Sequence, residues 1–398
     1  MAYQRYPLIT EKNLVLYHDA FAQTGEESAQ TQSAVLLCVG VLLRKEPEAP
    51  EAGAEERPLG ELFPEDDWAA LAIPKSLLDL RKHRGARYRT GLLRDELGAT
   101  AAERLKGARD FQDPEAETTF KDVQVSLSEQ LTRDPDPDIA ARLVENSLNH
   151  PQPLARVAAA SSGFDLFPED EDRAELLALL VEGLDSEDEL VRELAATVLA
   201  RVEPSHPRLG PLTPPGKEEE QGDPQHTSLL IHGTWARDNS WWQPSGDFHT
   251  YILNDVRPDL YSQPDRFDWS GGYSDAARSI AAGRLEIWIT ERQLNGLDLF
   301  CHSHGGSVAM EANHASLQIN QLVLLSCPVH PDKYAPNFDQ VNDVVSIRVK
   351  FDLVILADGG GQRFRDDRIR ENRLPIWFNH SASHDPEVWQ NHDVPALL

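Results

Sequence analysis

Short apolar runs alternate with helical patterns in the second half of the chain. The runs that we expect to be strands are 228–232, 297–301, 321–326, 344–350 and 374–378. Residues 275–290 have the spacing of a helix. Its expected inner face comprises Ala276, Ala277, Ile280, Ala281 and Leu285. Strands that alternate with helices predict an α/β fold with a mostly parallel sheet, covered by helices on both faces.

An internal repeat lies within residues 136–203. Residues 153–161 (PLARVAAAS) align with residues 189–197 (ELVRELAAT) at an offset of 36 residues. Each copy follows an apolar helical pattern, and a helix pair that repeats at this period is typical of a solenoid. The copies resemble HEAT-type repeats, whose second helix has an L-x-R-x-x-A-A pattern. This resemblance implies a protein partner, and the alternative is a helical cap that packs on the second domain.

A Pro-rich stretch separates the two patterns. Residues 203–226 hold six prolines and three glycines, which neither a helix nor a central strand tolerates. The sequence therefore predicts an all-α, HEAT-like domain over 1–203, a linker over 204–226 and an α/β domain over 227–398. Seven of the eight tryptophans lie after residue 234. Large aromatic side chains line ligand pockets, so we expect the functional site in the second domain.

Charge and cysteine content exclude several classes of function. The formal net charge of −28 disfavours binding to nucleic acid and to anionic membrane surfaces. The three cysteines, at positions 38, 301 and 327, show no spacing typical of a disulfide framework or a zinc ribbon. No secretory signal opens the chain, and the longest apolar run, 34–43, is about half of the ~20 residues that span a bilayer. We therefore expect a cytoplasmic protein that is not an integral membrane protein.

The strongest chemical motif is LDLFCHSHGG, from Leu297 to Gly306. It predicts a strand, a sharp turn centred on Ser303 and a helix that starts directly afterwards. Small residues must flank the serine, because bulky side chains would collide with the backbone in so tight a turn. The turn exposes the serine hydroxyl, and the helix N-terminus provides partial positive charge for a developing oxyanion.

This stretch looks like the nucleophile elbow of the α/β-hydrolase superfamily, and the chain from about residue 226 resembles that family. One departure is Cys301, which stands where the family has its first glycine but is still small. The sequence Leu230 to Trp235, LIHGTW, looks like the family's oxyanion-hole loop. The resemblance implies that the backbone N–H groups of Thr234 and His304 are the oxyanion donors. It also makes His302 and His304 ordinary family residues, so no metal site is expected.

A serine hydroxyl is a poor nucleophile, so a histidine must take its proton and an acid must orient that histidine. The family order of serine, acid and histidine implies Asp352, directly after the strand 344–350, as the acid; Asp358 is the alternative. The base should follow the last strand, where His380 and His384 are both candidates. Resemblance to the family's C-terminal pattern favours His380, and His384 remains the alternative base.

Aromatic residues fill the stretch between the expected oxyanion-hole loop and the next strand. They are Trp235, Trp241, Trp242, Phe248, Tyr251 and Tyr261. They either form a pocket wall over apolar acyl groups or pack one large loop.

These features predict a serine hydrolase of the α/β-hydrolase fold, a carboxylesterase or lipase that needs no cofactor. The expected substrate is a small-molecule ester with an apolar acyl group. An acyltransferase, thioesterase, amidase or phospholipase could use the same triad, because pocket shape selects the acceptor and leaving group. A different alternative is a partner-binding protein whose repeats carry the function and whose hydrolase domain is a scaffold.

Overall fold

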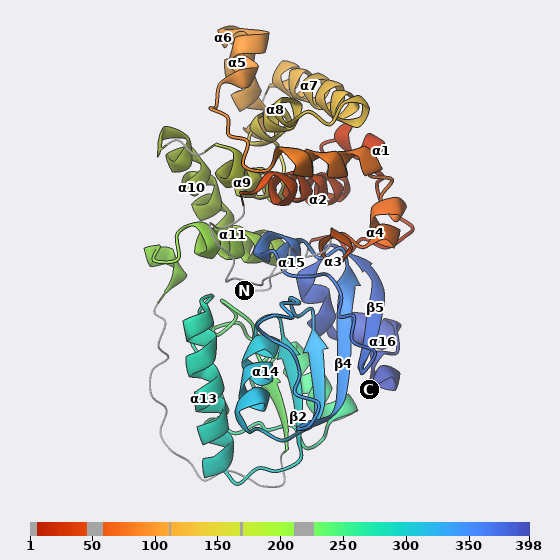
Figure 1. The fold of residues 1–398 in the computed structure, drawn as a ribbon, viewed down its shortest axis with the longest axis vertical. Helices are drawn as coiled ribbons and strands as arrows, with labels where there is room; N and C mark the ends of the chain where they lie inside the picture. The colour runs from red at the N-terminus through yellow and green to blue at the C-terminus, as the bar shows by residue number, and fades with distance from the viewer. Residues whose placement is uncertain (1–5, 46–58, 111–112, 168–169, 211–226) are drawn as a thin grey trace. The chain divides into compact units, whose positions relative to one another are not determined.

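The structure, a computed structural model, describes residues 6–45, 59–110, 113–167, 170–210 and 227–398. The chain divides into two compact units (Figure 1). Unit 1 comprises residues 1–202, 356–359 and 376–379, and unit 2 comprises residues 203–355, 360–375 and 380–398. Most of the predicted linker, residues 211–226, lies outside the described residues, so the linker stays a prediction.

Unit 1 is helical, as the sequence predicts. Its helices are α1 (Tyr17–Phe21), α2 (Glu26–Leu43), α3 (Leu59–Leu62), α4 (Glu65–Ala70), α5 (Leu92–Leu97), α6 (Ala99–Lys106), α7 (Pro114–Arg133), α8 (Pro137–Ser147), α9 (Pro153–Leu166), α10 (Asp170–Leu184) and α11 (Glu189–Val202). Proline opens α7, α8 and α9, where its fixed φ suits a helix and its missing N–H costs no hydrogen bond. The Asp113 and Asp136 carboxylates cap α7 and α8.

Helix α2 forms the centre of unit 1. Every residue from Ser28 to Leu43 is buried, which explains the apolar run 34–43 as part of a core helix. Helix α2 packs on α9, and the two backbones come close at Gly40. A Cβ atom at Gly40 would lie 2.9 Å from Ser162 Cα, and the Ser162 hydroxyl donates to the Leu36 carbonyl at 2.6 Å. Small side chains at this crossing therefore allow the two helices to interlock.

The two repeat copies have matching contacts. Helices α9 and α11 begin 36 residues apart, as the alignment implies. In the first copy, Arg156 Nη1 donates to the His150 carbonyl at 2.8 Å; in the second, Arg192 Nη1 donates to the Ser186 carbonyl at 2.7 Å. Each arginine therefore holds the turn six residues before it. The HEAT-like assignment itself stays a prediction.

The five predicted strands belong to unit 2, except for residues 376–377 at the end of the last strand, which belong to unit 1, as do residues 356–358 of the helix after the fourth strand. The strands are β1 (Ser228–Ile231), β2 (Leu297–His302), β3 (Ile319–Leu325), β4 (Val341–Lys350) and β5 (Ile369–Trp377). They form one sheet in the order β1-β2-β3-β4-β5, and the pairs β1–β2, β2–β3 and β3–β4 are parallel. The accompanying helices are α12 (Asp247–Tyr251), α13 (Asp275–Glu291), α14 (Gly305–Ala315), α15 (Leu353–Asp358) and α16 (Pro386–Asn391). The predicted parallel sheet is therefore confirmed.

Helices α13 and α14 pack on one another and share an apolar core with the strands (Figure 1). The predicted inner face of α13 is partly wrong, because Ala276 and Ile280 are exposed. The buried face instead comprises Ala277, Arg278, Ala281, Ala282, Leu285 and Ile289. Apolar residues occur on both sides of this helix, and a buried arginine interrupts the inner stripe, so periodicity alone did not identify it.

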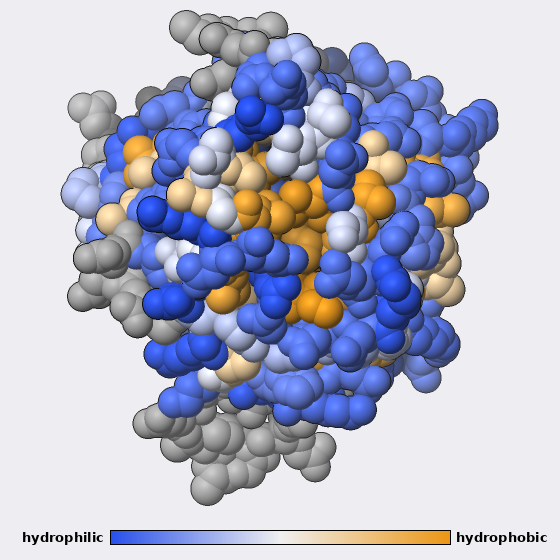
Figure 2. All heavy atoms as spheres, turned by 90° about the horizontal axis from the view of Figure 1, so that it is seen from above, coloured by the Kyte–Doolittle hydropathy of each residue, from blue (hydrophilic) through white to orange (hydrophobic). Residues whose placement is uncertain are grey.

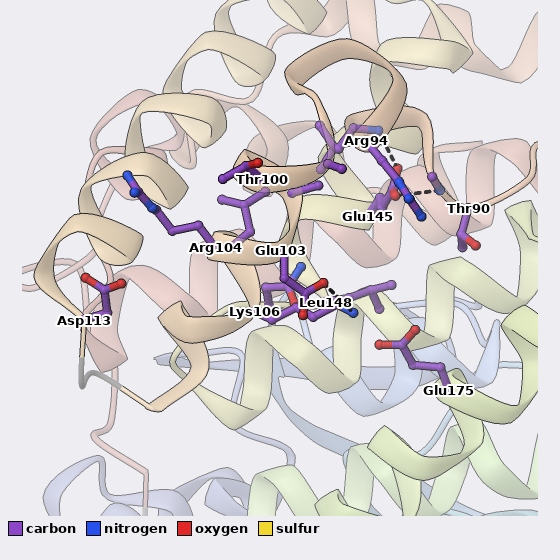
Figure 3. A pocket seen from close by; sticks show the side chains of 16 residues that line it. Thr90, Arg94, Thr100, Glu103, Arg104, Lys106, Asp113, Glu145, Leu148 and Glu175 are labelled. Atoms are coloured by element: carbon purple, nitrogen blue, oxygen red, sulfur yellow. Dashed lines mark hydrogen bonds and ion pairs between the residues drawn. The ribbon is translucent and has the colours of Figure 1, made fainter.

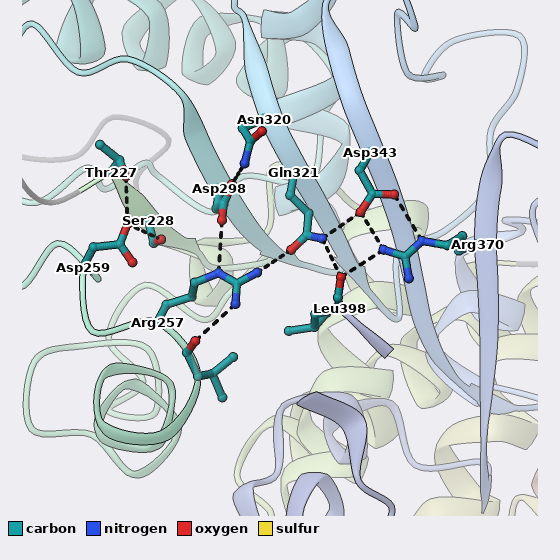
Figure 4. A network of polar contacts seen from close by, with 11 residues as sticks. Thr227, Ser228, Arg257, Asp259, Asp298, Asn320, Gln321, Asp343, Arg370 and Leu398 are labelled. Atoms are coloured by element: carbon teal, nitrogen blue, oxygen red, sulfur yellow. Dashed lines mark hydrogen bonds and ion pairs between the residues drawn. The ribbon is translucent and has the colours of Figure 1, made fainter. Parts of the chain in front are cut away.

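A row of polar groups crosses the amino ends of the strands (Figure 4). Asp298 of β2, Gln321 of β3 and Asp343 of β4 lie in register on neighbouring strands. Arg257 links the first two, through Asp298 Oδ2 at 3.0 Å and Gln321 Oε1 at 2.7 Å. Gln321 then donates to Asp343 at 2.7 Å, and Arg370 of β5 completes the row. Side chains at this edge are thus engaged in holding the strands together.

In the part of the chain that the structure describes, no helix combines the length and the apolar character needed to cross a bilayer.

Candidate active site

Strained backbone gathers at the carboxyl ends of the strands. Nine non-glycine residues in the described ranges have a positive φ, and five of them directly follow strands or the turn after β1. These five are Trp235, Ser303, Ser326, Phe351 and Phe378. Such conformations cost about 1–3 kcal/mol each and cluster at functional sites. The geometry therefore identifies this edge of the sheet as the candidate site independently of the sequence motif.

Ser303 lies in a sharp turn between β2 and α14. Its φ is +52°, its N–H donates to the Leu325 carbonyl at 2.9 Å, and its carbonyl accepts from the Gly306 N–H at 3.0 Å. A Cβ at Gly305 would lie 2.6 Å from the Ile231 carbonyl oxygen. A Cβ at Gly306 would come within 3.0 Å of Leu324. The two glycines are therefore required because α14 starts against the neighbouring strands.

The turn after β1 touches the Ser303 turn. A Cβ at Gly233 would lie 2.7 Å from Ser303 Cβ and 3.1 Å from the His302 carbonyl oxygen. The Trp235 N–H is used, since it donates to the Gly271 carbonyl at 3.1 Å. Thr234, between them, has no hydrogen bond from its N–H to any described residue. The loop therefore brings an available backbone donor close to the serine.

Asp352 and His380 are in direct contact. His380 Nδ1 lies 2.8 Å from Asp352 Oδ2, and both side chains are buried. The other carboxylate oxygen, Oδ1, accepts from the Val354 and Ile355 N–H groups at 3.0 and 3.1 Å. Because an ionised carboxylate only accepts, Nδ1 of His380 donates, and the lone pair of the neutral ring is on Nε2.

Gln362 also holds Asp352 in place. Its Oε1 accepts from the Asp352 N–H at 2.9 Å and its Nε2 donates to the Asp352 carbonyl at 3.0 Å. This residue was missed in the sequence analysis. Its role depends on the chain folding back ten residues later, and no local motif marks that return.

His302 and His384 lie beside His380. The His302 ring centroid is 4.6 Å from that of His380 and 4.5 Å from that of His384. Trp241 stacks on His384 at 4.0 Å with an interplanar angle of 15°. The predicted aromatic stretch therefore does border the candidate site through Trp241, while Trp242 and Phe248 are buried deeper. His384 is within this cluster, but the contact with Asp352 belongs to His380.

The two histidines of the HSH motif have different surroundings. His302 packs on His380 and His384, whereas His304 Nδ1 lies 2.7 Å from Arg278 Nη1 and its ring meets Tyr273 edge-on. His304 is the N-cap of α14, so its backbone is at the positive end of that helix.

Burial keeps two of the neighbouring imidazoles neutral. Desolvation lowers the pKa of His232 to about 4, and its Nδ1 donates to the Gly233 carbonyl at 2.8 Å. The ring of His232 packs between Trp242 and Trp269. Burial, and then the nearby His384 and His380, hold the pKa of His302 well below its ordinary value.

Residues 229–396 match the model of the alpha/beta hydrolase family. This part of the chain is an alpha/beta hydrolase domain. The match includes the Ser303 turn and extends past His384, while the helical region before it lies outside the match. No curated protein matches the chain.

Unit 1 contains a separate cavity of about 790 Å³ (Figure 3). Its buried floor includes Leu93, Leu105 and Leu148, and its rim carries arginine, lysine, glutamate and aspartate side chains. Glu145 accepts hydrogen bonds from the Gly91 and Leu93 N–H groups, and burial raises its pKa. The mixed charges of the cavity indicate no particular class of ligand.

Figure 2 shows the molecule from above, where a group of hydrophobic residues is surrounded by a hydrophilic surface.

The low pKa of His232 predicts a loss of stability in acid. The unfolded chain binds a proton at His232 below about pH 6.5, whereas the folded protein does so only near pH 4, so stability present at pH 7 is lost as the pH falls through this window. At pH 5 the loss should be about 2 kcal/mol. His232→Phe, which keeps an aromatic ring between the tryptophans, should reduce the pH dependence of the free energy of unfolding by that amount.

Urea unfolding at pH 7.5 and pH 5, followed by tryptophan fluorescence, measures this difference. His314→Phe is the matched control, because it removes an exposed histidine from the same unit. Equal pH dependence in His232→Phe and the wild type would contradict the assignment.

Proposed function

We propose that the alpha/beta hydrolase domain cleaves carboxylic esters through an acyl-enzyme on Ser303, with His380 as general base and Asp352 as the acid that orients it. The 2.8 Å contact between His380 Nδ1 and Asp352 Oδ2 carries this proposal. It joins a carboxylate that follows β4 to an imidazole that follows β5, at the edge of the sheet where Ser303 follows β2. Ester hydrolysis by a serine nucleophile requires a histidine base whose second ring nitrogen is held by an acid.

In the proposed reaction, His380 Nε2 takes the proton of the Ser303 hydroxyl as its oxygen attacks the ester carbonyl. The tetrahedral intermediate collapses when the C–O bond to the alcohol breaks, and His380 gives the proton to the leaving alcohol. A water molecule then attacks the acyl-enzyme by the same route and releases the carboxylic acid and Ser303. Asp352 stabilises the transient imidazolium, and its fixed position depends on α15 and Gln362.

The N–H groups of Thr234 and His304 are the proposed oxyanion donors. Thr234 is supported by the close approach of Gly233 to Ser303 and by the engagement of the next N–H, that of Trp235, with Gly271. His304 directly follows Ser303 at the N-terminus of α14, where the helix dipole favours negative charge.

The same contact supports His380 over His384 as the base, and Asp352 over Asp358 as the acid. His384 stacks on Trp241 within the aromatic cluster. We propose that this cluster contacts the acyl group, so esters with apolar acyl chains are the expected substrates.

Ser303→Ala should abolish ester hydrolysis while the protein stays folded. Loss of the nucleophile should reduce kcat/KM for p-nitrophenyl esters by at least about 10³-fold, because the remaining rate comes only from binding and the oxyanion donors. Ser326→Ala is the matched control: Ser326 is also a buried serine with a left-handed backbone, directly after the next strand. It should stay within about 10-fold of the wild type. Equal losses in both variants would refute Ser303 as the nucleophile.

The two histidines should differ sharply when each is changed to glutamine. His380→Gln should lower kcat by about 10³-fold, within the usual contribution of a general base, while His384→Gln should lower it by less than about 10-fold. Steady-state kinetics on one ester of medium chain length provides the comparison. If the larger loss falls on His384→Gln, the base has been assigned to the wrong histidine.

A further inference from the structure

Arg278 is buried in the first turns of α13 and reaches the residue that follows Ser303. Its guanidinium makes three directional contacts: Nη1 lies 2.7 Å from His304 Nδ1, Nε lies 3.1 Å from the Tyr334 hydroxyl, and Nη2 lies 2.5 Å from Asp275 Oδ1. Only 7% of the side chain is exposed. A planar group held at three corners has a fixed orientation, so Arg278 fixes the His304 ring relative to α13.

The contact between Arg278 and His304 determines the protonation state of the imidazole. Arginine has no acceptor and keeps its charge in proteins, so Nδ1 of His304 must accept this hydrogen bond. His304 is therefore neutral, with its proton on Nε2. Protonation of Nδ1 would break the bond and place two cations in contact, which is unfavourable in a buried site.

The charged and titratable groups around His304 support the same state. Two of these groups, Asp275 and Arg278, belong to α13. The others lie in the loop after β3; they are His330, Lys333 and Tyr334. Asp275 accepts from Lys333 at 2.7 Å and from Tyr334 at 3.0 Å. Partial burial opposes its ionisation, but the hydrogen bonds from Lys333 and Arg278 hold the pKa of Asp275 below its ordinary value.

Two aromatic rings and a hydroxyl complete the surroundings. Tyr273 meets the His304 ring edge-on at 5.6 Å, the His330 ring lies parallel to it at 6.2 Å, and Ser307 Oγ lies 3.4 Å from Nδ1. Asp275, the acid of α13, is bonded to Arg278. These contacts hold the His304 ring in one orientation, with Nδ1 as the acceptor of the Arg278 hydrogen bond.

We propose that Arg278 is a positioning residue of the active site: it holds His304 as a neutral imidazole and thereby fixes the backbone N–H of His304 beside Ser303. The catalytic part of this inference rests on the proposed function. Its consequence is that no histidine cation forms directly after Ser303 in the range around pH 6.5 where an ordinary histidine titrates.

The test compares the wild type with Arg278→Met, which removes the guanidinium while Asp275 keeps Lys333 and Tyr334 as partners. Arg292→Met is the matched control. Arg292 is the C-cap of α13, at the other end of the helix from Arg278, and is also 7% exposed and paired with a carboxylate, that of Asp265 at 2.7 Å. Its other partners are Trp288 and Glu291. The ring signals of ¹³C-labelled histidines are followed by NMR from pH 5 to pH 8, and His304→Asn identifies the signal of His304.

We expect the His304 signal to stay constant in the wild type and in Arg292→Met, and to change with pH between pH 5 and pH 8 in Arg278→Met, where Nδ1 no longer accepts a hydrogen bond from a cation. A His304 signal that titrates in the wild type, or that stays constant in folded Arg278→Met, would overturn the proposal. If Arg278→Met does not fold, a His304 signal that titrates in the wild type still overturns the proposal.

A second measurement tests the catalytic consequence. The rate at which a fluorophosphonate modifies Ser303 should fall by about 10-fold in Arg278→Met and gain a pH dependence that matches the His304 titration, while Arg292→Met stays close to the wild type. Equal losses in both variants would indicate a purely structural role for Arg278. If wild-type Ser303 is not modified at all, the proposed function fails, and the NMR result still decides whether Arg278 controls His304.

Discussion

The register of the parallel strands is the constraint on which the candidate site depends. Strands β1 to β4 run in one direction, so the residues that directly follow them come together at a single edge of the sheet. Gly233, Ser303 and Asp352 reach that edge from three different strands. At the opposite edge, the row from Asp298 to Arg370 uses its polar groups to join the strands. The carboxyl ends of the strands thus carry the candidate site, while polar side chains at the amino ends join the strands.

Neutral imidazoles lie at the same edge of the sheet as the contact in which a proton is proposed to move. Burial keeps His232 and His302 uncharged, and Arg278 does the same for His304 by occupying its Nδ1. A cation at His302, whose ring packs on that of His380, would oppose the protonation of His380 during the proposed reaction. His380 differs from them because the Asp352 carboxylate, held by two backbone N–H groups, favours its charged form. Packing and hydrogen bonding therefore keep three of these histidines neutral and leave His380 as the proposed base.

Local patterns predicted the parts of the molecule that depend on neighbouring residues. The five strands follow from apolar runs, and the turn at Ser303 follows from the small residues that its tight backbone requires. The choice between His380 and His384 stayed open in the sequence, since it depends on which ring reaches a carboxylate 28 residues away in the chain. Family order implied Asp352, which follows β4, but the hydrogen bonds between Gln362 and Asp352 are tertiary contacts that no motif marks.

The buried face of α13 is a second feature that local sequence predicts only in part. Its sequence has apolar residues on two faces, and the face that is buried includes Arg278. Burial of an arginine is acceptable only where acceptors meet it, and two of its acceptors, His304 and Tyr334, come from distant segments. The hydrophobic pattern therefore identifies only part of the buried face, because much of the reason for burying Arg278 lies outside the helix.

The site of covalent modification by a fluorophosphonate is the most direct measurement of the proposed chemistry. After reaction of the full chain, peptide mass spectrometry identifies the modified residue, and the rate is compared with that of Asp352→Asn. We expect one adduct per chain, on Ser303, and a rate at least about 10²-fold lower in Asp352→Asn, because the imidazole of His380 loses the partner that orients it. An adduct on another residue, or equal rates in the two proteins, would contradict a reaction centre built on Ser303, Asp352 and His380.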